Sequence, residues 1–302
     1  MMLNTFEQII DEARSGGKQR IAIAAAGDAD VLEAVKLAME MDLADFTLFG
    51  DEGIIRKLAG DVGLDLAGVE VIDETGLQMA ALKAVQYVSS GKAGTLMKGL
   101  IGTTDFLRAV LDKEVGLRTG SLISHVAVIR SPKFDRFFYL TDGAMNISPT
   151  LDQKVQIIKN AVKIAHALGN ENPKVACLAA VETVNPDMPA TIDASLLAKM
   201  SDRKQIKGCV VDGPFGLDNA VSAESAKHKG VSGLVAGKAD ILMCPEINTG
   251  NVIYKTLSYF ADVECGAVIS GARAPIVLTS RADSPRTKLL SMATAATVAK
   301  NS

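Results

Sequence analysis

Short apolar runs alternate along the whole chain with segments whose apolar residues recur at helical spacing. The runs predict buried strands over residues 20–26, 44–50, 69–73, 95–98, 174–180, 208–212, 239–245, 267–270 and 276–278. Amphipathic helices are predicted over residues 31–41, 54–59, 76–90, 151–168 and 192–200, after an opening helix around Phe6. Strands that alternate with helices in this way indicate an α/β fold.

One pair of apolar runs departs from this alternation. Residues 117–129 and 137–142 have no helical segment between them, only a short turn that contains Pro132. Two strands joined by so short a turn could pair as a hairpin. His125, on the first run, invites a catalytic role, but a partly buried, hydrogen-bonded histidine is the more frequent case.

The segment from Pro275 to Pro285 joins a strand directly to the start of a helix. Residues 276–278 are bulky and apolar, as suits a strand buried on both faces. Ser284 followed by Pro285 predicts a helix N-terminus, with serine as the cap and proline at the first helical position. The unpaired N–H groups of such a turn attract anions, and Arg281 beside it would suit a phosphate.

A second strand-to-helix turn follows residues 95–98. Its glycines let the backbone approach a ligand, and Thr103 and Thr104 offer hydroxyl groups at the predicted helix start. Lys98 precedes the turn and Arg108 lies about one helical turn after it, so two cations border it. The alternative is that Thr104 only caps the helix and that Arg108 is a solvated surface residue; the sequence favours neither.

Two further turns carry amide side chains. Asn146 lies in the turn that leads into the helix at 151–168, where it could donate an amide hydrogen bond or act as a cap. Asn248 lies in the run from Glu246 to Lys255, where amides and a hydroxyl surround a glycine before a helix, as in a ligand-binding turn. Asn248 could equally cap that helix.

Composition narrows the choice of partners. The chain has 302 residues, 48% of them hydrophobic, enough for a large core in two lobes. Its 32 basic and 35 acidic residues give a net charge of −3, and no basic block is present, which argues against a nucleic-acid or anionic-membrane partner. The N-terminus has no secretory signal pattern, and no apolar run approaches the roughly 20 residues of a membrane span. We therefore expect a cytoplasmic metabolic protein.

The cysteines and the glycine loops exclude further classes of site. The four cysteines are widely spaced and form no Cys-x-x-Cys pair, so we expect free thiols rather than disulfides or metal ligands. The turn at 27–29 lacks the spacing of a dinucleotide-binding loop, and residues 16–18 lack the Walker spacing. The sequence thus predicts no nucleotide-binding loop.

Five segments are similar to one family of enzymes, and the similarity extends over essentially the whole chain. They are Gly99–Arg108, Asp212–Val221, Val235–Asp240, Pro245–Lys255 and Pro275–Ser284. On these segments the chain resembles the phosphate acetyl/butyryl transferases. The resemblance implies the reversible reaction of an acyl-CoA with phosphate to give an acyl phosphate and CoA. It implies CoA as a substrate in fatty acid metabolism, and no permanently bound metal or redox cofactor.

The resemblance also implies two α/β lobes of the isocitrate/isopropylmalate-dehydrogenase type, a cleft between them that holds the site, and a homodimer. In that architecture the C-terminal segment returns to the first lobe. Turns near residues 143 and 271 are the places where the chain could divide. We therefore predict a first lobe of residues 1–143 and 271–302 and a second lobe of residues 144–270.

The resemblance assigns roles to particular residues. Arg108 and Arg281 match the family's arginines and are the expected phosphate ligands, because a guanidinium makes paired, charge-assisted hydrogen bonds. Ser280 matches the site serine, which could bond the acyl carbonyl oxygen or the CoA thiol. The residues expected to contact CoA or the acyl substrate are Lys98, Thr103, Thr104, Asn146, Asn248 and Lys255.

One position departs from the family pattern. Acetyl-specific members carry an aspartate, proposed as the general base, in the helix after the serine-arginine pair, and Thr287 stands there in this chain. Threonine cannot do the work of a carboxylate at neutral pH, so Asp283 is the candidate catalytic base. Its alternative role is to interact with the helix dipole. The departure favours the butyryl-type branch of the family over the acetyl-type branch.

Three other functions stay open. The chain could be an acetyl-type transferase of the same family, since one methylene is worth only about 1–3 kcal/mol of discrimination. A metal- and NAD-dependent decarboxylating dehydrogenase of the same architecture would need an aspartate cluster, for which no clear grouping is present. A non-catalytic acyl-CoA-binding protein would keep the basic residues but would need no base.

Overall fold

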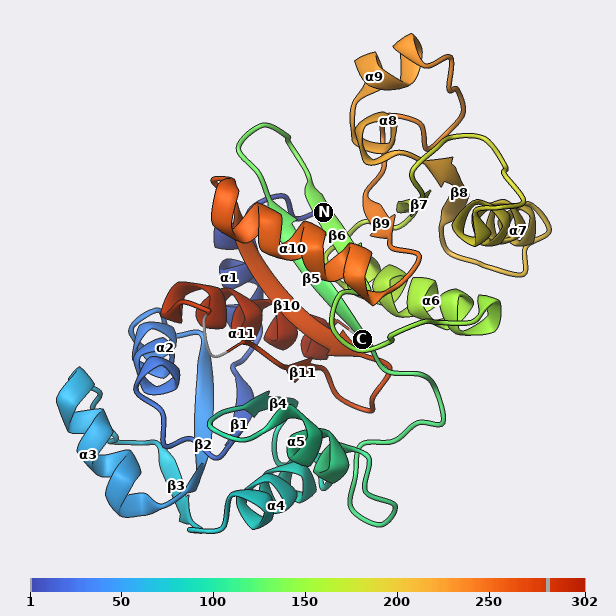
Figure 1. Ribbon diagram of the computed structural model, residues 1–302. Coiled ribbons are helices and arrows are strands. Elements are labelled where there is room, and N and C mark those ends of the chain that lie inside the picture. Colours follow the sequence, from blue (N-terminus) through green and yellow to red (C-terminus); the bar gives the residue numbers. More distant parts are fainter. Residues whose placement is uncertain (1, 281–282, 302) are drawn as a thin grey trace. The chain divides into compact units, whose positions relative to one another are not determined.

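The computed structural model describes residues 2–280 and 283–301, and it has an α/β fold (Figure 1). The chain divides into two compact units. The terminal unit comprises Phe6–Ser121 and the described residues from Gly266 onward, and the middle unit comprises residues 2–5 and Leu122–Cys265. Among the described residues, no helix is long and apolar enough to cross a membrane.

The terminal unit is built on a sheet of mostly parallel strands. Its strands are β1 (Gln19–Ala24), β2 (Ala44–Gly50), β3 (Glu70–Asp73), β4 (Thr95–Lys98), β10 (Glu264–Ser270) and β11 (Ile276–Val277). Their order is β3-β2-β1-β4-β11-β10, and β10 runs antiparallel to β11 while the other neighbours are parallel. Strand β4 is buried along its whole length, including its polar residues Thr95 and Lys98.

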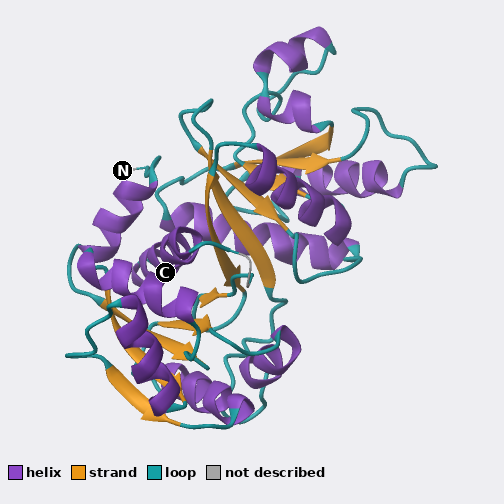
Figure 2. Ribbon diagram, turned by 60° about the vertical axis from the view of Figure 1, so that its left-hand side comes forward, coloured by secondary structure: helices purple, strands orange, loops and turns teal. Residues whose placement is uncertain are grey.

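Helices flank the strands of this sheet (Figure 2). They are α1 (Phe6–Arg14), α2 (Ala29–Glu40), α3 (Glu52–Val62), α4 (Leu77–Ser89), α5 (Thr103–Val110) and α11 (Pro285–Lys300). The helices predicted over 31–41, 54–59 and 76–90 are confirmed as α2, α3 and α4, with ends that differ by a few residues.

Helix α11 is the core helix of the terminal unit. It begins as the sequence predicts, because the Ser284 Oγ accepts a hydrogen bond from the Thr287 N–H at 3.2 Å and Pro285 is the first helical residue. Residues 288–298 are all buried, the pattern of a helix covered on every side. The helix contacts α1, α2, β1, β4 and β11, and in Figure 1 it lies beside α1 and α2.

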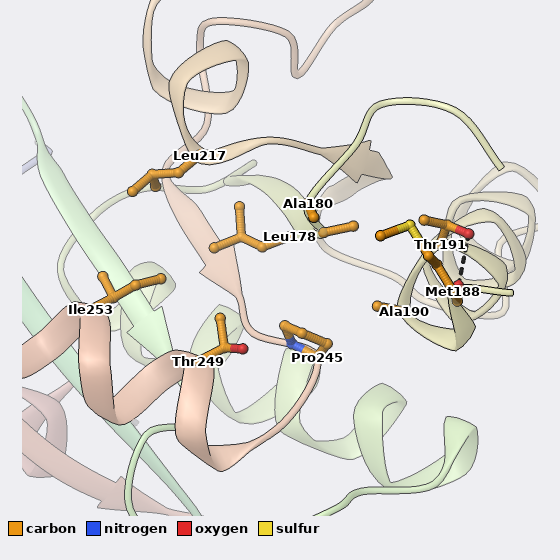
Figure 3. Close-up of a pocket in the computed structure, with 10 residues that line it drawn as sticks. Leu178, Ala180, Met188, Ala190, Thr191, Leu217, Pro245, Thr249 and Ile253 are labelled. Carbon is orange, nitrogen blue, oxygen red and sulfur yellow. Dashed lines mark hydrogen bonds between the residues drawn. The ribbon is translucent and has the colours of Figure 1, made fainter. Parts of the chain in front are cut away.

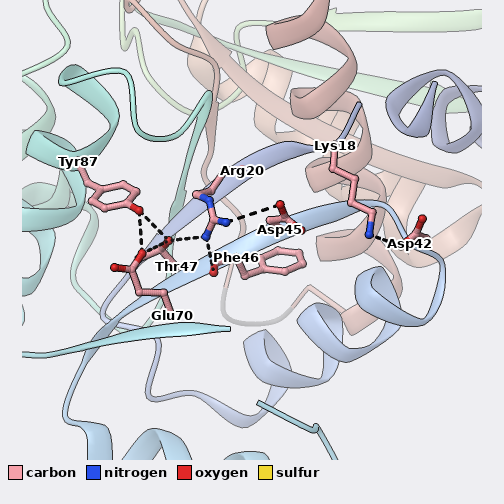
Figure 4. A network of polar contacts seen from close by, with 8 residues as sticks. All are labelled: Lys18, Arg20, Asp42, Asp45, Phe46, Thr47, Glu70 and Tyr87. Carbon is pink, nitrogen blue, oxygen red and sulfur yellow. Dashed lines mark hydrogen bonds and ion pairs between the residues drawn. The ribbon is translucent and has the colours of Figure 1, made fainter. Parts of the chain in front are cut away.

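A polar network ties the strands β1, β2 and β3 to helix α4 (Figure 4). The Thr47 hydroxyl is fully buried; it donates to Glu70 at 3.1 Å and accepts from the Arg20 guanidinium at 3.2 Å. The Tyr87 hydroxyl donates to the same Glu70 carboxylate at 2.7 Å. A buried hydroxyl inside a sheet is tolerated when it is hydrogen-bonded, and these contacts meet that need.

The middle unit has a second series of strands and helices. Its strands are β5 (Ser124–Arg130), β6 (Phe137–Thr141), β7 (Lys174–Leu178), β8 (Val210–Phe215) and β9 (Ile241–Met243). Its helices are α6 (Leu151–Ala167), α7 (Pro189–Asp202), α8 (Leu217–Val221), α9 (Ala223–His228) and α10 (Ile247–Phe260). The strand order is β5-β6-β9-β7-β8, with an antiparallel β5–β6 pair and parallel neighbours after it. The predicted hairpin is therefore confirmed.

The division between the units follows strand pairing. Residues 122–143, which the sequence prediction placed in the first lobe, lie in the middle unit, because β6 pairs with β9. Residues 266–270, which it placed in the second lobe, lie in the terminal unit, because β10 pairs with β11. The turns near residues 143 and 271 do not show which strands pair with each other, so they could not place these two boundaries correctly.

Candidate functional site

Polar side chains gather at the carboxyl ends of three neighbouring strands in the terminal unit. β4 lies between β1 and β11, and all three run parallel. Their carboxyl ends therefore meet at one edge of the sheet, the edge where α/β folds bind ligands. The turn after β4 leads into α5, and residues 278–280 follow β11 at the same edge.

The turn after β4 is fixed tightly against the end of β1. The Gly99 N–H donates to the Ala24 carbonyl at 2.8 Å, and a Cβ at position 99 would lie 2.2 Å from the Ala25 carbonyl oxygen. Lys98 is 6% exposed, and its ammonium donates to the main-chain carbonyls of Gly99 and Ile101, both at 3.1 Å. Lys98 thus braces this turn from within, and its contact with substrate stays a prediction.

The start of α5 presents exposed hydroxyl groups. Thr103 and Thr104 are the first two helical residues, and both are exposed. The cap is Gly102, which makes no side-chain capping bond, so the alternative that Thr104 caps the helix is wrong. The Arg108 side chain is 68% exposed and pairs with the Asp105 carboxylate at 2.5 Å. That exposure suits both a solvated arginine and one open to phosphate.

The segment between β11 and α11 has its own hydrogen bonds. The Ser280 N–H donates to the Asp283 carboxylate at 2.7 Å. Lys288 is 3% exposed; its ammonium donates to the main-chain carbonyl of Asp283 and lies 3.8 Å from the Asp30 carboxylate. Arg281, the predicted phosphate ligand, lies outside the described residues. Lys288 thus anchors the segment that carries Ser280 and Asp283.

Sequence reasoning missed Lys288. A lysine next to Leu289 and Leu290 in an amphipathic pattern is normally placed on the solvated face. Thr287, where acetyl-type relatives carry an aspartate, belongs to the cap of α11: its N–H binds the Ser284 Oγ and its own Oγ1 lies 3.1 Å from that oxygen. The sequence does contain one indication of Lys288: it is a lysine in the first turn of a helix, and that helix follows a turn suited to bind anions.

Asn146 belongs to a network in the middle unit. Its amide donates to the Asp142 carboxylate at 2.6 Å and to the Ile123 carbonyl at 3.0 Å. Asp142 is 2% exposed and also accepts the N–H groups of Ala144 and Met145. The cap of α6 is Thr150, so the alternative in which Asn146 caps that helix is wrong.

Glu246, rather than Asn248, caps helix α10. Its carboxylate accepts the N–H groups of Thr249 and Asn248 at 2.7 Å each, and the Asn248 side-chain amide at 2.8 Å. Burial tends to raise the pKa of Glu246, but these hydrogen bonds outweigh it and hold the pKa below its usual value. Asn248 is exposed, and the Lys255 ammonium lies 5.5 Å from the centre of the Tyr254 ring.

The turns that carry Asn146 and Asn248 lie side by side. The Asn251 amide donates to the Gly143 carbonyl at 3.1 Å, and a Cβ at Gly250 would lie 2.3 Å from the Asp142 carbonyl oxygen. His125 is 6% exposed, and its ring meets the Tyr254 ring edge-on. It is therefore a buried histidine in the core, which the sequence analysis gave as the alternative to a catalytic role. Asn146, Asn248 and Lys255 therefore lie in the middle unit, whereas the other described site candidates belong to the terminal unit.

The four cysteines form no disulfide bond, and burial makes Cys177, Cys209 and Cys244 poor nucleophiles. Cys177, Cys244 and Cys265 are buried and Cys209 is half-buried. Burial raises the pKa of Cys177 to about 12 and that of Cys209 to about 11, so little thiolate is present at neutral pH. Among the described residues, no three His, Cys, Asp or Glu side chains come together as metal ligands would.

These features define an α/β protein with hydroxyl groups and cations at the strand ends and at helix N-termini, a combination suited to an anionic substrate. The family model described as phosphate acetyl/butaryl transferase matches residues 4–80 and 74–296. This chain belongs to that family.

Proteins similar to this chain include both branches of the family. The phosphate butyryltransferase of Clostridium acetobutylicum is 54% identical over 300 residues, covering 99% of this chain and 100% of that protein. The phosphate acetyltransferase of Thermotoga maritima is 45% identical and covers 97% of this chain and 99% of that protein. A solved branched-chain phosphotransacylase from Enterococcus faecalis V583 has a TM-score of 0.85 at 34% identity, covering 94% of this chain and 100% of that structure.

Proposed function

We propose that this enzyme moves a short-chain, butyryl-like acyl group between CoA and inorganic phosphate, in the reaction acyl-CoA + phosphate = acyl phosphate + CoA. The observation that carries the proposal is the full-length, 54% identical match to a phosphate butyryltransferase. The reaction needs acyl-CoA, phosphate and acyl phosphate as substrates and products, and it needs no further cofactor.

In the direction of CoA acylation, the CoA thiolate attacks the carbonyl carbon of the acyl phosphate. The bond to the phosphate oxygen then breaks, and phosphate leaves with the bonding electrons. Three tasks follow: the thiol must lose its proton, the carbonyl oxygen must be stabilised as it gains charge, and the leaving phosphate must be held. The terminal unit offers candidates for each task.

Asp283 is the proposed base for the thiol, and the Ser280 hydroxyl is the proposed donor to the carbonyl oxygen. What supports this pair is the hydrogen bond from the Ser280 N–H to the Asp283 carboxylate, which keeps the two residues adjacent. Arg108 and Arg281 are the proposed phosphate ligands, and Thr103 and Thr104 at the start of α5 are proposed contacts to CoA or the acyl substrate. The buried Lys288 would hold the segment in place through the Asp283 carbonyl.

The remaining expectations are part of the same proposal. Asn146, Asn248, Lys255 and Lys98 are the proposed contacts to CoA or the acyl substrate. The enzyme would act in the cytoplasm as a homodimer, with lobes of the isocitrate/isopropylmalate-dehydrogenase type and a cleft between them. Analytical ultracentrifugation tests the dimer, because a monomer at micromolar concentration would contradict it.

The proposed reaction is tested by thiol release. Purified enzyme is mixed with acetyl-, butyryl-, isobutyryl- or hexanoyl-CoA at fixed phosphate, and the released CoA thiol is measured. We expect phosphate-dependent release with the highest kcat/KM for a four-carbon acyl group. A highest kcat/KM for acetyl-CoA would instead assign the chain to the acetyl-type branch.

Two results would reject the reaction itself. Binding of acyl-CoA without phosphate-dependent release would identify a non-catalytic acyl-CoA-binding protein. NAD reduction that depends on Mg²⁺ or Mn²⁺ would identify a dehydrogenase instead.

A further inference from the structure

The middle unit contains a pocket of about 440 Å³ (Figure 3). Two hydroxyl groups lie in its wall, and both are bonded to the protein. Thr191 donates to the Met188 carbonyl at 2.8 Å, and Thr249 donates to the Glu246 carboxylate. The other residues of the wall are apolar. The pocket thus does not indicate which ligand it would take, whereas the backbone of the terminal unit has a feature that points to a function.

Ala25 has a backbone conformation that is costly for alanine. Its φ is 54°, in the left-handed region, where the Cβ crowds the next carbonyl oxygen. Two other described residues besides glycine have a positive φ, Asp42 and Lys204, and each comes directly after the C-cap of a helix, a usual place for this conformation. Ala25 instead follows strand β1 and is 1% exposed. Strain of this kind persists only where neighbouring contacts hold it, and it clusters at functional sites.

The bend at Ala25 turns two consecutive carbonyl groups toward the turn between β4 and α5. The Ala24 carbonyl accepts the Gly99 N–H at 2.8 Å, and the Ala25 carbonyl accepts the Leu100 N–H at 2.7 Å. In a regular parallel sheet, successive residues of a strand bond to opposite neighbours. Because of the bend, the end of β1 therefore holds this turn by two adjacent hydrogen bonds rather than by one.

Lys98 holds the same turn from within. Its ammonium donates to the carbonyls of Gly99 and Ile101, and the Ile101 N–H donates to the Gly99 carbonyl at 3.0 Å. Helix α5 then begins after Gly102, which makes no side-chain capping bond. The start of α5 is therefore placed by the end of β1 and by Lys98, and not by a cap of its own.

We propose that Ala25 is a positioning residue of this enzyme, because its strained bend fixes the start of α5. The side chains placed in this way are those of Thr103, Thr104 and Arg108. The inference rests on the proposed function, in which these three side chains contact the substrates. Ala25 has only a methyl side chain, so it acts through the main chain. A bend that is already formed in the folded protein spares the substrates the cost of ordering α5.

Two substitutions at position 25 separate the bend from the size of the side chain. Ala25→Gly removes the strain and still permits the bend, whereas Ala25→Val makes the left-handed conformation much less accessible, since valine is β-branched. Ala26→Gly and Ala26→Val are the matched controls, because Ala26 is the next residue, is equally buried and has no positive φ. All four changes are made in the full-length enzyme.

The kinetic measurement is thiol release at saturating butyryl-CoA and varied phosphate. We expect Ala25→Val to raise the KM for phosphate by about 10-fold or more, because Arg108 is displaced, while the other three variants stay within about threefold of the wild type. A variant that is only less stable has fewer active molecules, which lowers kcat and leaves KM unchanged. An unchanged KM in Ala25→Val, or an equal rise in Ala26→Val or Ala25→Gly, would overturn the proposal.

A second variant keeps the proposal testable if Ala25→Val does not fold. Lys98→Met then takes its place, because it loosens the same turn. The KM for phosphate should rise more in the double variant Ala25→Gly/Lys98→Met than the two single changes together predict, since both residues hold one turn. Independent effects of the two changes would overturn the proposal.

Two measurements without substrate separate this inference from the proposed reaction. By urea unfolding, Ala25→Gly should be at least as stable as the wild type, whereas Ala26→Gly should be less stable. By hydrogen exchange, the amides of residues 99–110 should exchange faster in Ala25→Val than in Ala26→Val. If the wild type releases no thiol, the proposed reaction fails, but these two results still support the hold on the turn. If Ala25→Gly is destabilised as much as Ala26→Gly, the inference fails, whatever the turnover.

Discussion

Asp283 contacts the main chain of Ser280, and this contact leaves its carboxylate with two possible functions. It could take the proton of the CoA thiol, or it could hold the Ser280 segment in position by accepting the N–H at 2.7 Å. An asparagine separates these functions, because its amide oxygen can still accept the N–H but cannot take a proton at neutral pH.

We expect Asp283→Asn to lower kcat by about 100-fold or more, as loss of a general base does, with little change in the unfolding midpoint. Asp283→Ala should be similarly slow. The measurement is steady-state thiol release together with thermal unfolding. A kcat for Asp283→Asn within about threefold of the wild type, with Asp283→Ala slow, would show that the carboxylate positions the segment and that the base is elsewhere.

Lys288 is the buried cation of the same segment. Lys288→Met keeps the length of the side chain but leaves the Asp283 carbonyl without the ammonium, which should cost about 1–3 kcal/mol of unfolding free energy. Urea unfolding measures this, with Arg286→Met as the control, because Arg286 lies in the first turn of the same helix and its side chain is 41% exposed. Equal stability of Lys288→Met and the wild type would show that the contact contributes nothing.

Cys209 is the accessible thiol of the middle unit. Because burial raises its pKa to about 11, its thiolate, and therefore its alkylation rate, should increase about tenfold for each pH unit between pH 7 and pH 10. Unfolded protein, whose thiols have an ordinary pKa of about 8.5, should level off near pH 9. Iodoacetamide labelling followed by mass spectrometry measures both rates. A native rate that levels off below pH 9 would contradict the raised pKa.

The elements of the fold could be predicted well from sequence because their signals are local. Neighbouring residues alone were enough to predict the Ser284 cap with Pro285 after it. They were also enough to predict the hairpin whose turn contains Pro132. The cap of α10 could not be predicted, because glutamate is not a usual capping residue and Asn248 is two positions away. The burial of Lys288 depends on helices far away in the chain, so no local pattern indicates it.

Gly99 lies in the turn between β4 and α5, where there is no room for a side chain. A methyl group there would lie 2.2 Å from the Ala25 carbonyl oxygen, so the turn into α5 would have to move. We expect Gly99→Ala to lower kcat/KM by about 10-fold or more, since misplacement by about 1 Å far from the chemistry can cost 100-fold. Gly102→Ala is the matched control, because a Cβ at Gly102 meets no atom within 4 Å. Equal kinetics for the two variants would show that the turn has no part in the site.

At the scale of the whole molecule, the terminal unit needs both ends of the chain. Residues from 266 onward supply most of β10, together with β11 and the core helix α11, while Phe6–Ser121 supplies the rest. Sequence could predict this return of the C-terminus through the family resemblance, but the division after Ser121 and after Cys265 depends on strand pairing between distant segments.

A chain that ends at residue 270 lacks β11 and α11. It should fail to form the terminal unit, because the core surfaces of α1 and α2 lose the helix that covers them. We expect most of it to be insoluble on expression, measured as the soluble fraction in a cell lysate. The control is full-length Ser284→Ala, which loses about 1 kcal/mol of helix capping and should stay soluble. A soluble, cooperatively unfolding truncated chain would contradict this.

The dependence of β4 on the late strand β11 has a consequence for biosynthesis. At about 5–20 residues per second, the ribosome needs roughly 10–30 s after Ser121 to deliver β11. Until then, one side of β4 is an unpaired strand edge, open to pairing with other nascent chains. The middle unit is nearly contiguous in sequence and can fold in that interval. The first part of the terminal unit is therefore exposed to mispairing until β11 is made, and slower translation of the middle segment lengthens that exposure.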